Sequence, residues 1–130
     1  MGNNNSSLGK FAEDFAAKIY AARGFKIAAR NFSNPKGKRM GELDLVAVKN
    51  SQIRFVEVKC RTSDKFGIDL EILTRAKSGR MRLISEYFLK NFPCYGSFSR
   101  HFDFVFVQVR GTAPFDKKSY RIKIYSDCMI

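Results

Sequence analysis

Histidine and cysteine are scarce in this chain, which has one histidine and three cysteines among 130 residues. Cys60, Cys94 and Cys128 are odd in number and form no CxxC pair, so the sequence predicts reduced thiols and a cytoplasmic protein. His101 has no histidine or cysteine neighbour at ligand spacing, which favours a structural role over a zinc site. No apolar run reaches the roughly 18 residues that a membrane-spanning helix needs, so no membrane partner is expected.

Acidic residues are also few, because 12 Asp and Glu stand against 24 Lys and Arg, giving a formal charge of +12. This surplus predicts a polyanionic partner such as nucleic acid, since neutralising phosphates releases condensed counterions. Solubility alone is the alternative explanation. Half of the acidic residues lie within 42–71, after a basic run of Lys36, Lys38 and Arg39. An acidic island in a basic protein suits a divalent cation surrounded by groups that bind phosphates.

The length predicts one domain, expected over 8–130 after a disordered segment at 1–7. Apolar spacing predicts a helix from Leu8 to Arg23 and a basic amphipathic helix over about 72–91. Strands are predicted at 25–31, 43–48, 53–59, 101–109 and 119–125, with 101–109 central and the last at an edge. This order indicates an α/β fold in which helices pack against a mixed sheet.

The strands at 43–48 and 53–59 are separated by the polar link KNSQ, which predicts a hairpin. Residues whose numbers sum to about 101 should lie opposite each other, so Asp44 should face Glu57 across the pair. Strand alternation places Glu42 with Asp44 on one face and Leu43 with Leu45 on the other, while Glu57 shares a face with Lys59. Charged residues are uncommon in apolar strands unless they pair or bind a metal. An ordinary exposed face with ion pairs to Lys59 is the alternative.

Two carboxylates beside an amine can support phosphodiester hydrolysis. Carboxylate oxygens suit Mg²⁺ or Mn²⁺, and phosphate oxygens can complete the shell. The cation would polarise the phosphoryl group and lower the pKa of an attacking water. The Lys59 amine would orient that water or stabilise the developing charge.

Two short segments give the sequence a resemblance to a known group of enzymes. GELDLV at 41–46 and VEVKCR at 56–61 resemble the PD-(D/E)XK nuclease motif, with a spacing similar to that of archaeal Holliday-junction resolvases. More closely, the chain resembles the bacterial YraN family, predicted endonucleases of that superfamily, from about Gly9 to Val109. The matching positions are Gly9, Glu13, Arg30-Asn31, the two segments above, Lys77, Arg80-Met81, Phe88-Leu89 and Phe102-Asp103.

The resemblance implies a restriction-endonuclease-like sandwich, a central mixed sheet flanked by helices, and assigns roles to individual residues. Asp44 and Glu57 would be metal ligands, Lys59 the catalytic lysine, and Glu13 a further ligand or water-positioning carboxylate. Glu13 lies at the flank of the apolar stripe of its helix, so a solvated surface residue is the alternative there. Glu42 also matches and is expected just outside the ligand shell. Apart from the resemblance, the positive charge predicts contacts with nucleic acid at Lys36, Lys38, Arg39, Arg61, Lys77 and Arg80, with a solvated basic helix face as the alternative for Lys77 and Arg80.

These expectations favour a Mg²⁺-dependent or Mn²⁺-dependent endonuclease acting on DNA, in preference to RNA, and on branched or single-stranded forms. A nucleic-acid-binding module that keeps the fold without cleaving is the first alternative, and a partner-binding domain with surface ion pairs is the second. A homodimer is expected only by analogy to the resolvases.

Overall fold

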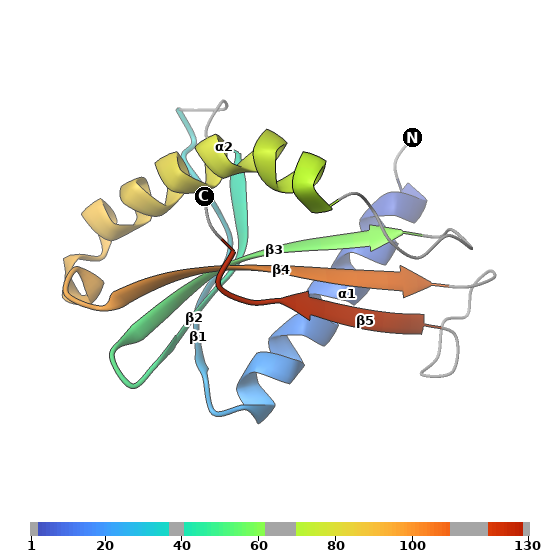
Figure 1. Ribbon diagram of the computed structural model, residues 1–130, viewed down its shortest axis with the longest axis horizontal. Helices are drawn as coiled ribbons and strands as arrows, with labels where there is room; N and C mark the ends of the chain where they lie inside the picture. Colours follow the sequence, from blue (N-terminus) through green and yellow to red (C-terminus); the bar gives the residue numbers. More distant parts are fainter. Residues whose placement is uncertain (1–2, 37–40, 62–69, 110–119, 129–130) are drawn as a thin grey trace.

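The described residues form a mixed five-stranded β-sheet with a long helix against each face (Figure 1). A computed structural model describes the backbone of residues 3–36, 41–61, 70–109 and 120–128, and their side chains apart from 3–6, 61 and 70–78. The predicted α/β class is therefore confirmed. The elements in chain order are α1 (Asn3–Ala22), β1 (Lys26–Ser33), β2 (Glu42–Lys49), β3 (Gln52–Arg61), α2 (Leu70–Asn91), the 3-10 turn η2 (Pro93–Tyr95), β4 (Ser99–Val109) and β5 (Tyr120–Tyr125).

The strands lie in chain order across the sheet, from β1 to β5. Only β3 and β4 among the described strands are parallel, and α2 lies in the long connection between them. β5 is an edge strand as predicted, and β4, which includes 101–109, lies inside the sheet between β3 and β5, next to the middle strand β3. β4 has its apolar sequence because both of its faces are covered, with Phe104 packed on the α2 side and Val105 on the α1 side.

The predicted hairpin is confirmed, and its turn is made by Asn50 and Ser51, which have φ angles of 49° and 62°. Positive φ at both central residues gives the turn the twist that antiparallel strands prefer. The first helix differs from expectation, because α1 begins at Asn3 and therefore includes residues 3–7 of the segment expected to be disordered. Apolar spacing placed its start at Leu8, and the polar residues before that position carry no such signal.

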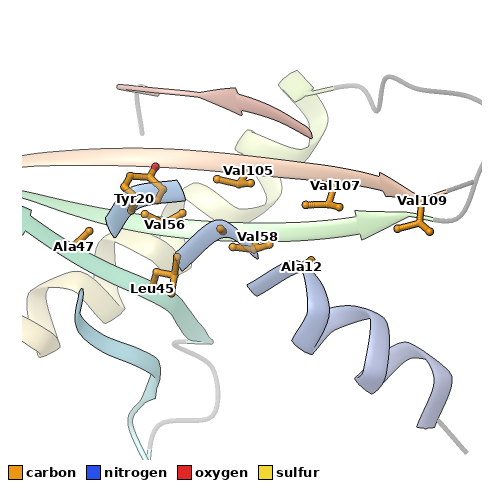
Figure 2. Close-up of a cluster of buried hydrophobic side chains, with 10 residues drawn as sticks. Ala12, Tyr20, Leu45, Ala47, Val56, Val58, Val105, Val107 and Val109 are labelled. Atoms are coloured by element: carbon orange, nitrogen blue, oxygen red, sulfur yellow. The ribbon is translucent and has the colours of Figure 1, made fainter. Parts of the chain in front are cut away.

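Two apolar cores lie on opposite faces of the sheet. On one face, Ala12, Ala16 and Tyr20 of α1 recur every four residues and pack on valines of β3 and β4. Figure 2 shows the side chains of this core, with the valines of both strands in rows. On the other face, Met81, Ile84 and Phe88 of α2 pack on a second apolar cluster, which confirms the predicted amphipathic helix.

A buried polar network fixes α1 to the sheet. The Tyr20 hydroxyl donates a hydrogen bond to Oδ2 of Asp103, whose side chain is 1% exposed. Oδ1 of Asp103 accepts from Nη1 of Arg54 and from the backbone N–H of Asp127, each at 3.0 Å. Burial and the Asp103 charge raise the pKa of Tyr20 far above its ordinary value, so its hydroxyl remains a donor. His101 contacts Asp127 through Nδ1, in keeping with its predicted structural role.

Tyr20→Phe should lower the free energy of unfolding by about 1–3 kcal/mol, because it leaves a buried carboxylate oxygen without its donor. The change is measured by urea unfolding at neutral pH. Tyr95→Phe is the control, since its half-buried ring packs on Phe88 and Phe98, and its effect should stay within about 0.5 kcal/mol. Equal effects of the two substitutions would show that the Tyr20 hydroxyl contributes no net stability.

Candidate functional site

The candidate site lies where β2 and β3 separate. Their pairing runs from Lys49–Gln52 to Leu45–Val56, which confirms the predicted register. Beyond this point β2 remains paired with β1 alone, as in Phe32–Leu43, while β3 continues beside β4 to its end at Arg61. Figure 1 shows β2 turning toward α2 while β3 runs on along β4. The two strands thus form a fork whose first residues are Asp44 and Glu57.

Asp44 fills the base of this fork. Its side chain is only 7% exposed, and Oδ2 accepts a hydrogen bond of 2.7 Å from the backbone N–H of Val58. Antiparallel partners normally supply such acceptors from their backbone carbonyls. The Asp44 carboxyl group takes that place where the two strands have parted, so an acidic side chain completes the hydrogen bonding of β3.

The expected alternation of β2 fails at Asp44. Leu43 and Leu45 were expected on one face, but Leu43 packs in the α2-side core and Leu45 in the α1-side core. The side chains of β1 change faces at the same level. Arg30 pairs with Asp14 of α1, whereas Phe32, two residues later, packs against α2 residues on the other face. Between Arg30 and Phe32, Asn31 has a left-handed backbone with a φ of 52°. In both β1 and β2, the alternation of side chains between the two faces is therefore interrupted at Asn31 and Asp44, which lie opposite each other. A strict alternation with a period of two residues cannot predict such an interruption.

Three carboxylates from two elements converge at this position. Glu13 of α1, Glu42 and Asp44 each offer an oxygen, and these oxygens lie within 4.8 Å of one another. Glu42, expected just outside the ligand shell, thus belongs to the same group as Glu13 and Asp44. Glu57 is 6% exposed and lies outside this group of three, although its charge acts on Asp44. Nζ of Lys59 lies 3.8 Å from Oε2 of Glu57, so the amine reaches the same fork.

Burial and like charge dominate the electrostatics of the site. Burial, followed by the charges of Glu57, Glu13 and Glu42, raises the pKa of Asp44 to about 8, although the hydrogen bond from the Val58 N–H acts in the opposite direction. The pKa of Glu13 is also raised, first by burial and then by Glu42. A site that disfavours several negative charges in this way gains most from a proton or a bound cation.

A neighbouring amide and guanidinium offset part of this repulsion. Asn31 donates a side-chain hydrogen bond to Glu13, and the Arg30 charge lowers the pKa of Glu13. The sequence patterns predicted no role for Arg30 or Asn31. One usable signal was present, because asparagine is depleted in strands and enriched among residues with positive φ.

The residues expected to contact nucleic acid are only partly described. Lys36 is exposed after β1, and its backbone N–H donates to Oδ1 of Asn34. Arg80 is exposed on α2 and lies close to Gly41, because a Cβ atom at position 41 would be 3.8 Å from Cβ and Cδ of Arg80. Gly41 has a φ of +76°, so a glycine suits the entry into β2. Lys38 and Arg39 lie outside the described residues, and the description of Arg61 and Lys77 covers their backbone alone.

The amino-acid sequence is similar to those of other proteins, both as a family and individually. Residues 12–107 match the model of a family described as "Uncharacterised protein family UPF0102". The chain belongs to this family. The expected membership of the YraN family is confirmed at this level. Helices within the described ranges do not have the length and apolar character needed to cross a membrane.

Individual UPF0102 proteins are similar over most of the chain. A UPF0102 protein of Clostridium perfringens strain SM101 is 32% identical over 127 residues, which cover 98% of this chain and 97% of the relative. One from Acinetobacter baylyi is 38% identical over 98 residues, covering 75% and 67% of the two chains. One from Syntrophomonas wolfei is 42% identical over 89 residues, covering 68% and 74%.

Asp44→Asn should stabilise the protein at pH 8 in a chelating buffer, by about 1–3 kcal/mol in the free energy of unfolding. A carboxyl group whose folded pKa is raised contributes stability below pH 4, and this contribution is lost as the pH rises toward 8. Asparagine keeps an acceptor for Val58 and removes the charge, so the stabilisation should disappear near pH 4. Urea unfolding at both pH values measures it.

Asp14→Asn is the control for this experiment. Asp14 lies on α1, one residue from Glu13, but its pKa is lowered by a hydrogen bond from Arg30. Its neutralisation should therefore give no stabilisation at pH 8. An equal gain from both variants, or a gain from Asp44→Asn that persists at pH 4, would contradict the electrostatic account of the fork.

Proposed function

We propose that this UPF0102 protein is a metal-dependent endonuclease that hydrolyses phosphodiester bonds in DNA, with the restriction-endonuclease-like fold of the PD-(D/E)XK superfamily. The observation that carries the proposal is the convergence of Glu13, Glu42 and Asp44 within 4.8 Å at the fork beside Glu57 and Lys59. The mixed sheet with a helix on each face is consistent with that fold.

The chemistry of the donor groups fits Mg²⁺ or Mn²⁺. All candidate ligands are carboxylate oxygens, which suit hard divalent cations rather than zinc or copper. Asp44 and Glu13 would bind the cation, joined by Glu57 or Glu42. When bound, such a cation polarises the phosphoryl group and lowers the pKa of a coordinated water.

The roles of the other residues follow from their positions. Lys59 has a side chain that is 31% exposed, so its amine is reachable by a substrate and lies beside Glu57. The protonated amine would donate a hydrogen bond to the attacking water or to a phosphoryl oxygen that gains charge in the transition state. Glu57 would keep the amine oriented toward the fork.

DNA is the proposed substrate because the charge of the whole chain favours a polyanion. A formal charge of +12 is compatible with phosphate binding around an acidic centre, where positive groups offset repulsion from the carboxylates. Arg80 can contribute to phosphate binding near the site, because it lies beside Gly41 and hence beside the start of β2.

The test is cleavage of labelled duplex, single-stranded, flapped and four-way DNA, and of RNA of matched sequence, with Mg²⁺ or Mn²⁺. Wild-type protein should cleave at least one DNA substrate and lose all activity in a chelator. Asp44→Ala, Glu57→Gln and Lys59→Ala should each reduce the cleavage rate at least roughly 100-fold, the usual effect of removing one charge-stabilising group. DNA binding should survive in all three.

Glu86→Gln is the matched control for Glu57→Gln. Glu86 is exposed on α2 and pairs with Arg100 at 2.7 Å, outside the fork. Its neutralisation should leave cleavage at the wild-type rate. Binding of DNA without cleavage in either metal would instead support the alternative of a non-catalytic nucleic-acid-binding module. Cleavage that persists in Asp44→Ala would contradict the site assignment.

A further inference from the structure

Asn31 has an unusual backbone conformation for a residue inside a strand. It lies within β1, yet its φ of 52° belongs to the left-handed region. Asn50 and Ser51 also have positive φ angles, but they form the hairpin turn, where such angles are expected. Asn31 makes no turn, because pairing with β2 continues on both sides of it, through Arg30–Leu45 and Phe32–Leu43. The conformation therefore needs another explanation.

The position of Asn31 in the sheet explains its positive φ angle. The register places it across from Asp44, where both strands turn over between the two faces of the sheet. A left-handed residue in β1 lets Arg30 point toward α1 and Phe32 toward α2. Asn31 is thus the residue of β1 that lies at the level of the acidic group.

The Asn31 side chain contributes a specific contact as well. Its amide donates a hydrogen bond to the Glu13 carboxylate, which in turn lies within 4.8 Å of Asp44 and Glu42. The preceding residue, Arg30, binds the acid next to Glu13, with 2.6 Å between its Nη2 and Oδ1 of Asp14. Two consecutive residues of β1 therefore hold two consecutive acids of α1.

We propose that Asn31 is a positioning residue, which holds the Glu13 carboxylate beside Asp44 so that the two can bind one divalent cation. The inference rests on the proposed function, since it concerns the same metal site. This role explains the left-handed conformation of Asn31, because this conformation directs the side-chain amide toward Glu13. The amide then restricts the position of the flexible Glu13 carboxylate. Hydrogen bonds of this kind to metal ligands usually matter strongly for metal affinity.

Asn31→Gly separates the two contributions of this residue. Glycine adopts a φ of 52° without strain, so the backbone of β1 and the stability of the fold should be preserved while the amide donor is lost. The Mn²⁺ affinity, measured by isothermal titration calorimetry of the full chain without DNA, should fall roughly tenfold. The rate of DNA cleavage at low Mn²⁺ should fall, with recovery at saturating Mn²⁺.

Asn50→Gly is the matched control, because Asn50 has a φ of 49° and lies in the hairpin turn. It carries the same substitution at the same backbone conformation and should leave Mn²⁺ affinity unchanged. The double variant Glu13→Gln with Asn31→Gly should bind Mn²⁺ no more weakly than Glu13→Gln alone, since both changes remove the same function.

The outcomes separate this inference from the proposed function. Wild-type affinity in Asn31→Gly, or an equal loss in Asn50→Gly, would overturn the positioning role while leaving the nuclease proposal intact. Weaker binding in Asn31→Gly, with the predicted non-additivity, would support the role even if wild-type protein cleaved no nucleic acid. Failure of the wild-type protein to bind Mn²⁺ would reject both.

Discussion

The site depends on one interaction, the hydrogen bond between the Asp44 carboxylate and the Val58 N–H at the point where β2 and β3 part. A buried carboxylate near three others is unfavourable by itself, because burial and repulsion both oppose its charge. The fork keeps Asp44 in place by making its oxygen the acceptor that β3 needs. This gives the protein a buried acidic group with a fixed position and a strongly raised pKa, a combination that often marks functional sites.

The surrounding fold holds the remaining carboxylates with comparable precision. Glu13 precedes Tyr20 by seven residues, or about two helical turns, so both lie on nearly the same side of α1. The bond from Tyr20 to Asp103 fixes that helix at one end, and the contacts of Arg30 and Asn31 fix it near Glu13. Glu57 and Lys59 come from β3, the central strand, whose buried valines pack under α1. The site therefore combines groups from a rigid strand, a fork and a helix held at two places.

Much of this arrangement could be predicted from local patterns. The hairpin register followed from the KNSQ link, and the pairing of Leu45 with Val56 has the predicted sum. The face switch between Leu43 and Leu45 could not be predicted, since it requires the left-handed conformation of Asn31 in another strand. The contact between Tyr20 and Asp103 spans 83 residues and depends on packing of the complete fold. The proximity of Glu42 to Glu13 has the same origin, because alternation says which face a residue occupies but not how far a strand bends.

The most direct test of the account is anomalous diffraction from crystals of the wild-type protein grown with Mn²⁺. The account predicts an anomalous peak at bonding distance from Asp44 and Glu13, with Glu57 or Glu42 as a further ligand. Carboxylates that bind a hard cation should place oxygen atoms about 2–2.3 Å from it. A fork without a peak at millimolar Mn²⁺, or a Mn²⁺ ion bound only elsewhere on the protein, would contradict the claim that these carboxylates form a metal centre.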